Sequence, residues 1–282
     1  MFFAQLLILG LLAGAVLSLV AIGFTLVLGV GKIANFAHGA FVAVGMYLGY
    51  EAFVAWRISP YLTLLPALAL FGLAGWAMAE VFERRGRKVG EVGELLVGLA
   101  LLLLINGLLE ALFSDNPRSL TGVNIGFLPA AGISIPWTEL VAAIFTFLVA
   151  GGLHVLIRVS RWGRALRATA EDPVVAGLCG IRVPIMQRAA VTLSIVVAGL
   201  AGVIIAPFTV LTPSAGTTYL ISAFAVVVLG GIGSTAGAVV AGLVIGVADS
   251  MAAGYLSSYW TTLAPLLIIL GYLLIRPGRV TA

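Results

Sequence analysis

Long apolar runs alternate with short polar intervals along the whole chain. Most runs hold about 20 residues, which is the length that an α-helix needs to cross the roughly 30 Å hydrocarbon core of a bilayer. The pattern therefore predicts an all-α polytopic membrane protein with about eight transmembrane helices plus one short broken or re-entrant helix. The predicted spans are residues 6–29, 40–56, 61–81, 92–113, 137–157, 188–210, 235–254 and 257–275.

The short helix is predicted at residues 219–231, which are apolar but only 13 in number. At 1.5 Å per residue they reach about 20 Å, which is too little to cross the bilayer upright. The glycine-rich segment 230–234 then interrupts the run, so we expect the chain to turn there. A full crossing and a re-entrant helix are both compatible with this pattern.

A second break, residues 32–39, follows the first span. Each break comes after an apolar run rich in β-branched residues and before a helix of small residues. Paired interrupted helices in two halves of a transporter point to a central site, because their freed backbone groups face a polar substrate. The two breaks therefore raise the hypothesis of an inverted repeat.

Glycines recur at intervals of four in the predicted spans, which favours a close approach of helix backbones. The pairs are Gly10 with Gly14, Gly45 with Gly49, Gly233 with Gly237, and Gly242 with Gly246. We therefore expect a tightly packed helix bundle.

Composition supports the membrane assignment. The chain is 62% hydrophobic and 9% charged, with a mean hydropathy of +1.19, whereas about a quarter of the residues of a soluble domain are charged. We therefore expect residues 1–282 to form a single transmembrane domain. Cys179 is the only cysteine, which excludes an internal disulfide and a multi-cysteine metal site.

Basic residues set the predicted orientation, because cytosolic loops of membrane proteins carry an excess of lysine and arginine. Of the 15 basic residues, 13 fall on one side of the predicted topology, and only Arg57 and Arg118 fall on the other. This split places the loops 83–88 and 158–187 and the C-terminus in the cytosol. The N-terminus is then expected outside.

The loop 158–187 is the longest polar interval of the chain. It holds arginines at positions 158, 161, 164 and 167, one per turn of a predicted helix, and then Glu171, Asp172 and Pro173. A loop that only reverses the chain does not need these charges, so we interpret it as a docking surface for a soluble partner. The alternative is a basic loop that only contacts lipid phosphates.

Candidate chemistry is concentrated at the breaks and at one intramembrane acid. Asn35 and His38 can hydrogen-bond a polar solute, or can instead satisfy backbone groups at the helix end. Asp249 lies deep in an apolar run, where an acid points to function, whereas Glu80 and Glu110 lie near span ends, where interfacial water solvates them. The predicted substrate path is Asn35, Phe36, His38, Gly39, Gly230, Gly231, Gly233, Ser234 and Asp249.

The sequence carries no recognisable catalytic constellation. Its two histidines, His38 and His154, are far apart, and zinc-protease spacing, a nucleophile elbow and a phosphate-binding loop are all missing. We therefore expect no enzyme activity, no metal site and no cofactor.

Three motifs carry a family resemblance. They are Asn35-Phe36-Ala37-His38-Gly39 after the first span, the segment from Gly163 to Pro173 with Gly180-Ile181 in the polar loop, and Leu229-Gly230-Gly231-Ile232-Gly233-Ser234 before the penultimate span. In order and spacing, over essentially the whole chain, they resemble the permease subunits of LIV-type branched-chain amino acid ATP-binding-cassette (ABC) importers. The sequence departs from that pattern at Ala40, where several relatives carry an acid, and at Thr235-Ala236, where Ile-Pro often stands.

The resemblance implies a multi-pass subunit of a bacterial or archaeal inner membrane. Its implied partners are a second permease subunit, two cytosolic ATP-binding subunits that hydrolyse ATP, and a periplasmic or extracellular solute-binding protein. The family's cytosolic loop contains a short coupling helix that fits a groove in the ATPase, and here that helix would lie at about residues 172–178. The implied coupling residues are Arg164, Arg167, Glu171, Asp172, Pro173, Ala176, Gly177 and Gly180.

The expected function is that of a permease which imports branched-chain amino acids, or a related small solute, by alternating access. The resemblance leaves open whether the second permease is a different chain or a second copy. The alternative is a channel or secondary transporter that works alone on a small polar solute such as urea or an amide. That alternative needs paired buried carboxylates or a charged filter, and the intramembrane acids of this chain are sparse and unpaired in sequence.

Overall fold

The computed structural model describes residues 2–32, 35–86, 90–120, 123, 126–130, 133–257 and 260–275. Part of the first break and the basic residues Arg87, Lys88, Arg276 and Arg279 lie outside these ranges. Within the described ranges the α-helices are α1 Phe2–Leu26, α2 Ala37–Trp56, α3 Leu64–Val81, α5 Glu91–Phe113, α6 Trp137–Val159, α7 Arg161–Glu171, α8 Pro173–Leu178, α9 Val183–Ile205, α10 Ala215–Gly230, α11 Thr235–Tyr255 and α12 Trp260–Ile275.

Seven of the described helical segments are long and apolar enough to cross a membrane, and two shorter apolar helices, Ala215–Gly230 and Leu263–Tyr272, accompany them. The predicted class, an all-α polytopic membrane protein, is confirmed. The predicted short helix is α10, which ends at Gly230. Gly231 and Gly233 then adopt φ angles of 91° and 83°, a left-handed conformation that glycine tolerates and that turns the chain.

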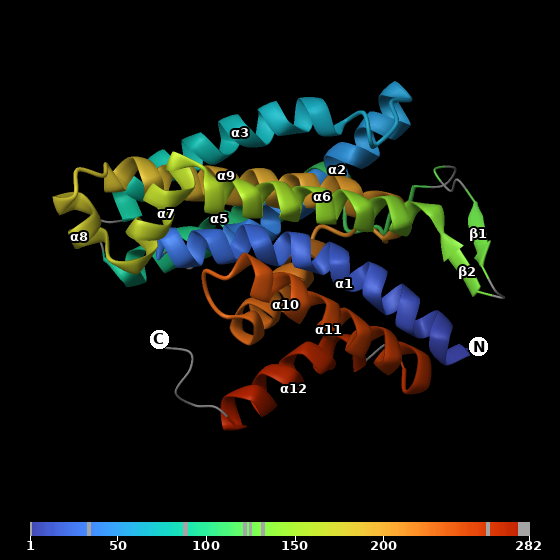
Figure 1. Ribbon diagram of the computed structural model, residues 1–282. Coiled ribbons are helices and arrows are strands. Elements are labelled where there is room, and N and C mark those ends of the chain that lie inside the picture. Colours follow the sequence, from blue (N-terminus) through green and yellow to red (C-terminus); the bar gives the residue numbers. More distant parts are fainter. Residues whose placement is uncertain are drawn as a thin grey trace.

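The long helices lie roughly side by side, so that the molecule has two ends (Figure 1). The N-terminus and the β-hairpin lie at one end, and α7 and α8 project from the other. Helix α9 lies at the centre, where it packs against α1, α2 and α3. On the other side of α1, helices α10 to α12 form the second part of the bundle.

The predicted close packing of helices is confirmed at the glycine pairs. A Cβ atom on Gly14 of α1 would lie 2.6 Å from the carbonyl oxygen of Gly242 in α11, and one on Gly246 would lie 2.2 Å from the Cα of Gly14. A Cβ atom on Gly45 of α2 would lie 2.1 Å from the carbonyl oxygen of Gly199 in α9. Only glycine permits these backbone contacts, because real Cβ atoms do not approach other atoms so closely.

The polar loop corrects one sequence-based expectation. The regular arginine spacing predicts a single helix through residues 158–167, whereas α6 ends at Val159 and α7 begins at Arg161. Ser160 is extended, and its hydroxyl accepts a 2.8 Å hydrogen bond from the backbone N–H of Gly163. This N-cap stabilises a new helix start, so the arginines belong to two helices that meet at an angle (Figure 1).

A small hairpin of two strands, β1 Phe127–Ala130 and β2 Ile133–Pro136, lies in the interval between the predicted spans 92–113 and 137–157, where the sequence pattern predicts no regular element. The strands are antiparallel, and Phe127 pairs with Pro136. Arg118 anchors the same end of the molecule through backbone hydrogen bonds of 3.0 and 2.7 Å with Leu211. Its guanidinium group also donates to the carbonyl of Phe113 at 2.8 Å and lies over the rings of Phe113 and Tyr50.

Candidate functional site

The second predicted break contacts the end of the first predicted span, just before the first break. Helix α1 continues as a π-helical turn, Val27–Gly31, and Lys32 then has a φ of 53°. The hydroxyl of Thr25 accepts a 2.8 Å hydrogen bond from the backbone N–H of Gly233, and a Cβ atom on Gly29 would lie 2.7 Å from the Cα of Gly233. We call this the break contact. The cavity beside it holds about 40 Å³, little more than one water molecule.

Ser234 begins the next helix. Its hydroxyl accepts a 3.0 Å hydrogen bond from the backbone N–H of Gly237 and so caps α11. A Cβ atom on Gly230 would lie 2.5 Å from the carbonyl oxygen of Gly237, so the end of α10 packs directly on the start of α11. The second break is thus a tight turn whose backbone lies against α1.

Asn35 and His38 are fully buried. The side-chain oxygen of Asn35 accepts a 3.1 Å hydrogen bond from the backbone N–H of Ala37 at the start of α2. His38 Nδ1 lies 2.9 Å from the hydroxyl of Ser194 in α9, and Nε2 lies 3.0 Å from the carbonyl oxygen of Val20 in α1. These contacts satisfy both nitrogens of the neutral ring, so His38 joins three helices.

Neighbouring residues of the first break also serve packing. Phe36 packs against the main hydrophobic core, and a Cβ atom on Gly39 would lie 2.4 Å from the carbonyl oxygen of Gly216 in α10. None of these residues lines the main cavity described next. Their part in a substrate path stays a prediction.

The main cavity lies among α1, the start of α6, and α10 to α12, and has a volume of about 400 Å³. Asp249 of α11, the acid singled out in the sequence, lines it together with Glu139 of α6. Its other walls are apolar or carry hydroxyl groups. They include Leu9, Val16, Leu17, Phe208, Thr218, Ser222, Ser250 and Thr261.

A second cavity of about 400 Å³ adjoins the main cavity at the hairpin end. Glu139 and Phe208 line both cavities. Phe127 and Pro136 of the hairpin line the second one, so it lies beneath β1 and β2. Together the two cavities extend from the hairpin end of the molecule towards Asp249.

The main cavity and the break contact lie at different depths. Residues of α1 between Leu9 and Leu17 line the cavity, and Thr25 follows eight residues later. At 1.5 Å per residue, Thr25 lies about 12 Å further along the helix axis. The two adjoining cavities thus lie on the hairpin side of the break contact.

Helix α8 occupies the position predicted for the short helix of the loop. One side-chain oxygen of Asp172 accepts hydrogen bonds from the backbone N–H groups of Val174 and Val175 at 2.8 and 3.1 Å. Asp172 is therefore the N-cap, and Pro173 opens the helix, as proline does at first helical positions. Gly180 follows the helix with a φ of 81°, a common way to end one.

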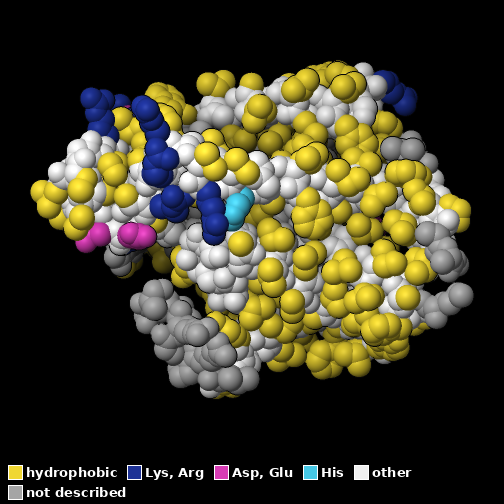
Figure 2. Space-filling view, viewed as in Figure 1, with side chains coloured by type: hydrophobic (Ala, Val, Ile, Leu, Met, Phe, Trp, Pro, Cys, Tyr) yellow, Lys and Arg dark blue, Asp and Glu magenta, His cyan; other side chains and the backbone are white. Residues whose placement is uncertain are grey.

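The outer face of α8 is apolar and uncovered. Val174, Val175 and Leu178 are 72%, 53% and 83% exposed, whereas Ala176 is buried against the rest of the molecule. Glu171 and Asp172, which directly precede the helix, are also exposed. Figure 2 shows acidic side chains beside an apolar tip, with basic side chains gathered over the junction of α6 and α7.

The arginines of α7 contact the end of α6. Arg164 donates a 3.0 Å hydrogen bond to the carbonyl oxygen of Val159, and Arg167 donates to that of Ile157. Cations near a helix C-terminus satisfy free carbonyls and favour the negative end of the helix dipole. The two arginines therefore fix the angle between α6 and α7, and their exposed side chains keep further donors free for a partner.

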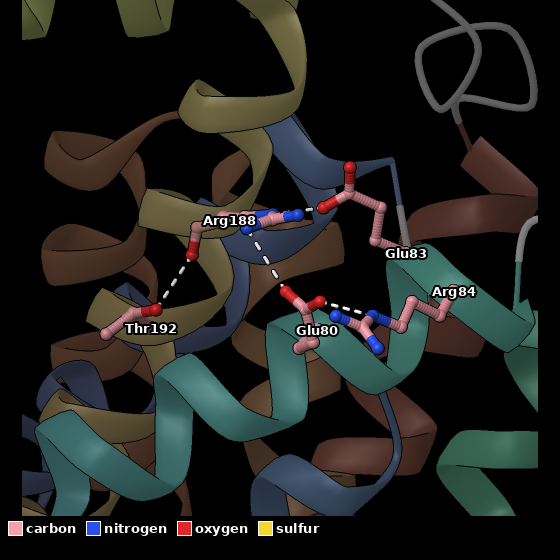
Figure 3. Close-up of polar contacts among 5 residues, drawn as sticks. All are labelled: Glu80, Glu83, Arg84, Arg188 and Thr192. Carbon is pink, nitrogen blue, oxygen red and sulfur yellow. Dashed lines mark hydrogen bonds and ion pairs between the residues drawn. The ribbon is translucent and has the colours of Figure 1, made fainter.

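An ion-pair cluster joins the same end of α9 to α3 (Figure 3). Arg188 lies 3.1 Å from Glu80 and also pairs with Glu83, and Glu80 pairs in addition with Arg84. Glu80 was expected to be solvated at a span end, and it lies there in contact with both arginines. Because Arg188 follows α8 closely in sequence, the cluster links the loop to α3.

Glu139 and Ser222 are the site residues that sequence reasoning missed. Glu139 is the third residue of a predicted span, where acids are usually solvated by interfacial water, and Ser222 is one small residue in an apolar run. Only the packing of α6, α10 and α11 around one cavity brings them together with Asp249.

Comparison with known proteins adds independent information. Residues 6–275 match the model of a family described as branched-chain amino acid transport system / permease component. A high-affinity branched-chain amino acid transport system permease protein LivH of Salmonella typhimurium is 31% identical over 98% of this chain and 94% of its own length. A high-affinity branched-chain amino acid transport system permease protein BraD of Pseudomonas aeruginosa is also 31% identical, over 98% of this chain and 94% of its own length.

An archaeal relative, a probable branched-chain amino acid transport permease protein LivH of Methanocaldococcus jannaschii, is 29% identical over 94% of this chain and 88% of its own length. No solved structure gives a significant match.

Proposed function

The chain belongs to the family of branched-chain amino acid transport system permease components, and on that premise we propose that it is a membrane-spanning permease subunit of an ABC importer. Its solute is a branched-chain amino acid or a related small molecule. The match over residues 6–275 is the observation that carries this proposal. The relatives described above come from two bacteria and an archaeon, and each is named as a permease protein of branched-chain amino acid transport.

The cavity and the break contact support a mechanism of alternating access. A solute delivered at the hairpin end enters the cavity that Asp249 and Glu139 line, while the break contact blocks its exit. Movement of α1 against the turn at Gly231 to Ser234 separates Thr25 from Gly233 and opens the other side. Such a contact suits a gate because it consists of one hydrogen bond and small residues, which rearrange at little cost.

Helix α8 is the proposed coupling helix. Its three exposed apolar side chains suit a groove on a soluble ATPase, and the exposed acids Glu171 and Asp172 directly precede the helix. Uncovered apolar groups on a polar loop favour a protein partner over lipid phosphates. The ion pairs of Arg188 provide a path by which displacement of α8 reaches α3 through α9.

The proposed assembly contains a second permease subunit, two cytosolic ATP-binding subunits and a solute-binding protein outside the membrane. In this arrangement the end with α7 and α8 faces the cytosol of a bacterium or archaeon, and the N-terminus lies outside. Gathering of basic side chains at the α7 end supports that orientation. This subunit hydrolyses no ATP itself.

Uptake of radiolabelled leucine into proteoliposomes tests the proposal. The complete complex is compared with this chain alone and with a complex whose ATP-binding subunits carry a substitution that prevents hydrolysis. We expect uptake only by the complete active complex in the presence of ATP. Uptake by the chain alone would instead identify a stand-alone transporter, and no uptake by the complete complex would refute the assigned solute.

A further inference from the structure

We infer that the main cavity is a subsite for the ammonium group of a zwitterionic amino acid, held by the carboxylates of Asp249 and Glu139. This inference rests on the proposed function, because it requires that the chain conducts a solute. It narrows the solute to molecules with a cationic nitrogen and an apolar body. Urea, neutral amides and aromatic acids without an amino group do not meet that requirement.

The state of Asp249 is the first observation. Its Oδ1 atom is buried and has no hydrogen-bond partner among the described residues. The adjacent Ser250, in contrast, donates a 2.8 Å hydrogen bond to the carbonyl oxygen of Leu6 and joins α11 to α1. An unpaired carboxylate within an apolar bundle is costly, and such groups mark solute or ion pathways.

The charge of the cavity is the second observation. It has two acids in its lining and, among the described residues that line it, no lysine, arginine or histidine. Two carboxylates without a counter-ion create a negative potential that attracts a cation in a site of low dielectric constant. The second cavity shares Glu139 and likewise has no basic residue in its described lining, so the same field extends towards the entrance.

The remaining walls suit the other parts of an amino acid. Thr218 lies in the first turn of α10, and its hydroxyl and the positive end of that helix favour a carboxylate. Leu9, Val16 and Leu17 form an apolar surface on α1 for an aliphatic side chain. A volume of about 400 Å³ falls within the usual range of small-molecule sites.

Reactivity of an introduced cysteine tests the charge directly. Cys179 is the only cysteine of this chain and lies exposed on the loop, so in the Cys179→Ser background Ser222→Cys carries the only thiol of this chain, whose labelling is measured on its own band from the complete transporter. The quantity measured is the ratio of the labelling rates by a cationic and by an anionic methanethiosulfonate. We expect this ratio to be about tenfold higher at position 222 than for a free thiol in solution, and a factor of ten corresponds to about 1.4 kcal/mol. Asp249→Asn should lower that preference, and Asp249→Glu should retain it. A preference that is unchanged in Asp249→Asn would overturn the inference.

Leucine uptake by the complete complex separates this inference from the proposed function. Asp249→Asn and Glu139→Gln should each reduce uptake at least tenfold, with unchanged amounts of assembled complex. Glu110→Gln, which alters an exposed acid outside the cavity, should have no effect. Uptake by the wild type but equal uptake by Asp249→Asn would refute the subsite and leave the function standing. Loss of assembly in Asp249→Asn would show that Asp249 pairs with the second permease, which also refutes the subsite.

Discussion

His38 shows how a polar side chain can hold an apolar bundle together. Its ring lies on α2 and hydrogen-bonds to Ser194 on α9 and to Val20 on α1. It also contacts the ring of Phe24, with centroids 5.4 Å apart. Because the ring is fully buried, its loss leaves a cavity between the helices and removes the hydrogen-bond partner of the Ser194 hydroxyl.

His38→Ala should therefore destabilise the protein by about 2–4 kcal/mol, from the lost volume and the unsatisfied Ser194 hydroxyl. Thermal unfolding in detergent, followed by the loss of monodisperse protein, measures the effect. His154→Ala is the matched control, because His154 is only half-buried and lines an apolar cavity of about 390 Å³ between α6 and α11. An equal loss of thermal stability in the two variants would contradict the proposal that His38 stabilises the packing of α1, α2 and α9.

At the same scale, Asp249 and Glu139 show what a sequence can reveal about a site. Asp249 stands out in the sequence because an acid amid apolar residues is costly in any arrangement. Glu139 does not stand out, because an acid near the start of a span is solvated in most membrane proteins. Its position at the junction of two cavities depends on which face of α6 meets α1 and α10, and that information lies in the packing.

At the scale of elements, α8 projects from one end of the molecule (Figure 1), and its side chains Val174, Val175 and Leu178 are exposed. Capping by Asp172 and the backbone hydrogen bonds at Gly180 hold it without help from its outer face. The exposed side chains of that face are therefore free to serve binding. Changing one of them should affect a partner and leave the fold intact.

Leu178→Ser should lower the amount of ATP-binding subunit that co-purifies with the permease, because an apolar contact in the ATPase groove is lost. A reduction of about tenfold corresponds to 1.4 kcal/mol. Leu62→Ser, which alters an exposed side chain in the turn before α3 and outside the loop 158–187, is the control and should retain the partner. Full co-purification with Leu178→Ser would argue against α8 as the docking element.

Contacts between whole helices depend on single glycines. Gly45→Ala should strongly destabilise the bundle, because its Cβ would clash with the backbone of Gly199 in α9. Gly107→Ala in α5 is the matched control, since nothing lies within 4 Å of its Cβ position, and alanine there should be neutral or stabilise the helix by up to about 1 kcal/mol. Melting temperatures of the two variants check this, and similar values would contradict the packing.

Helices and strands were predictable from the sequence where their length or boundaries depend only on neighbouring residues and on the thickness of the bilayer. The long helices lie within a few residues of the predicted spans, because the bilayer fixes their length. The turn at Ser160 was missed because arginines three apart fit one helix as well as two, although a serine N-cap was available as a signal. The hairpin at Phe127–Pro136 was missed because its short strands alternate too little to stand out from a loop. The sequence shows the glycine pairs four residues apart, but it does not show which helix each pair contacts.

At the scale of the molecule, the cavities, the break contact and α8 follow one another from the hairpin end of the bundle to the opposite end. Two adjoining cavities extend from the hairpin end, the break contact lies beyond them, and α8 lies at the far end with ion pairs that link α9 to α3. This order is what an ATP-driven gate requires, because a solute site and a coupling element must lie on opposite sides of the closed contact.

The central claim is that this chain forms a solute path whose accessibility is set by its ATPase partners. The most direct measurement is the labelling rate of Ser222→Cys, in the Cys179→Ser background, by a membrane-impermeant cationic reagent added from outside. We expect that trapping the complete transporter with ATP and vanadate changes this rate by about tenfold relative to the nucleotide-free complex, because the cavity changes the side it faces. An equal labelling rate in both states would show that the ATP-binding subunits do not set the accessibility of the cavity.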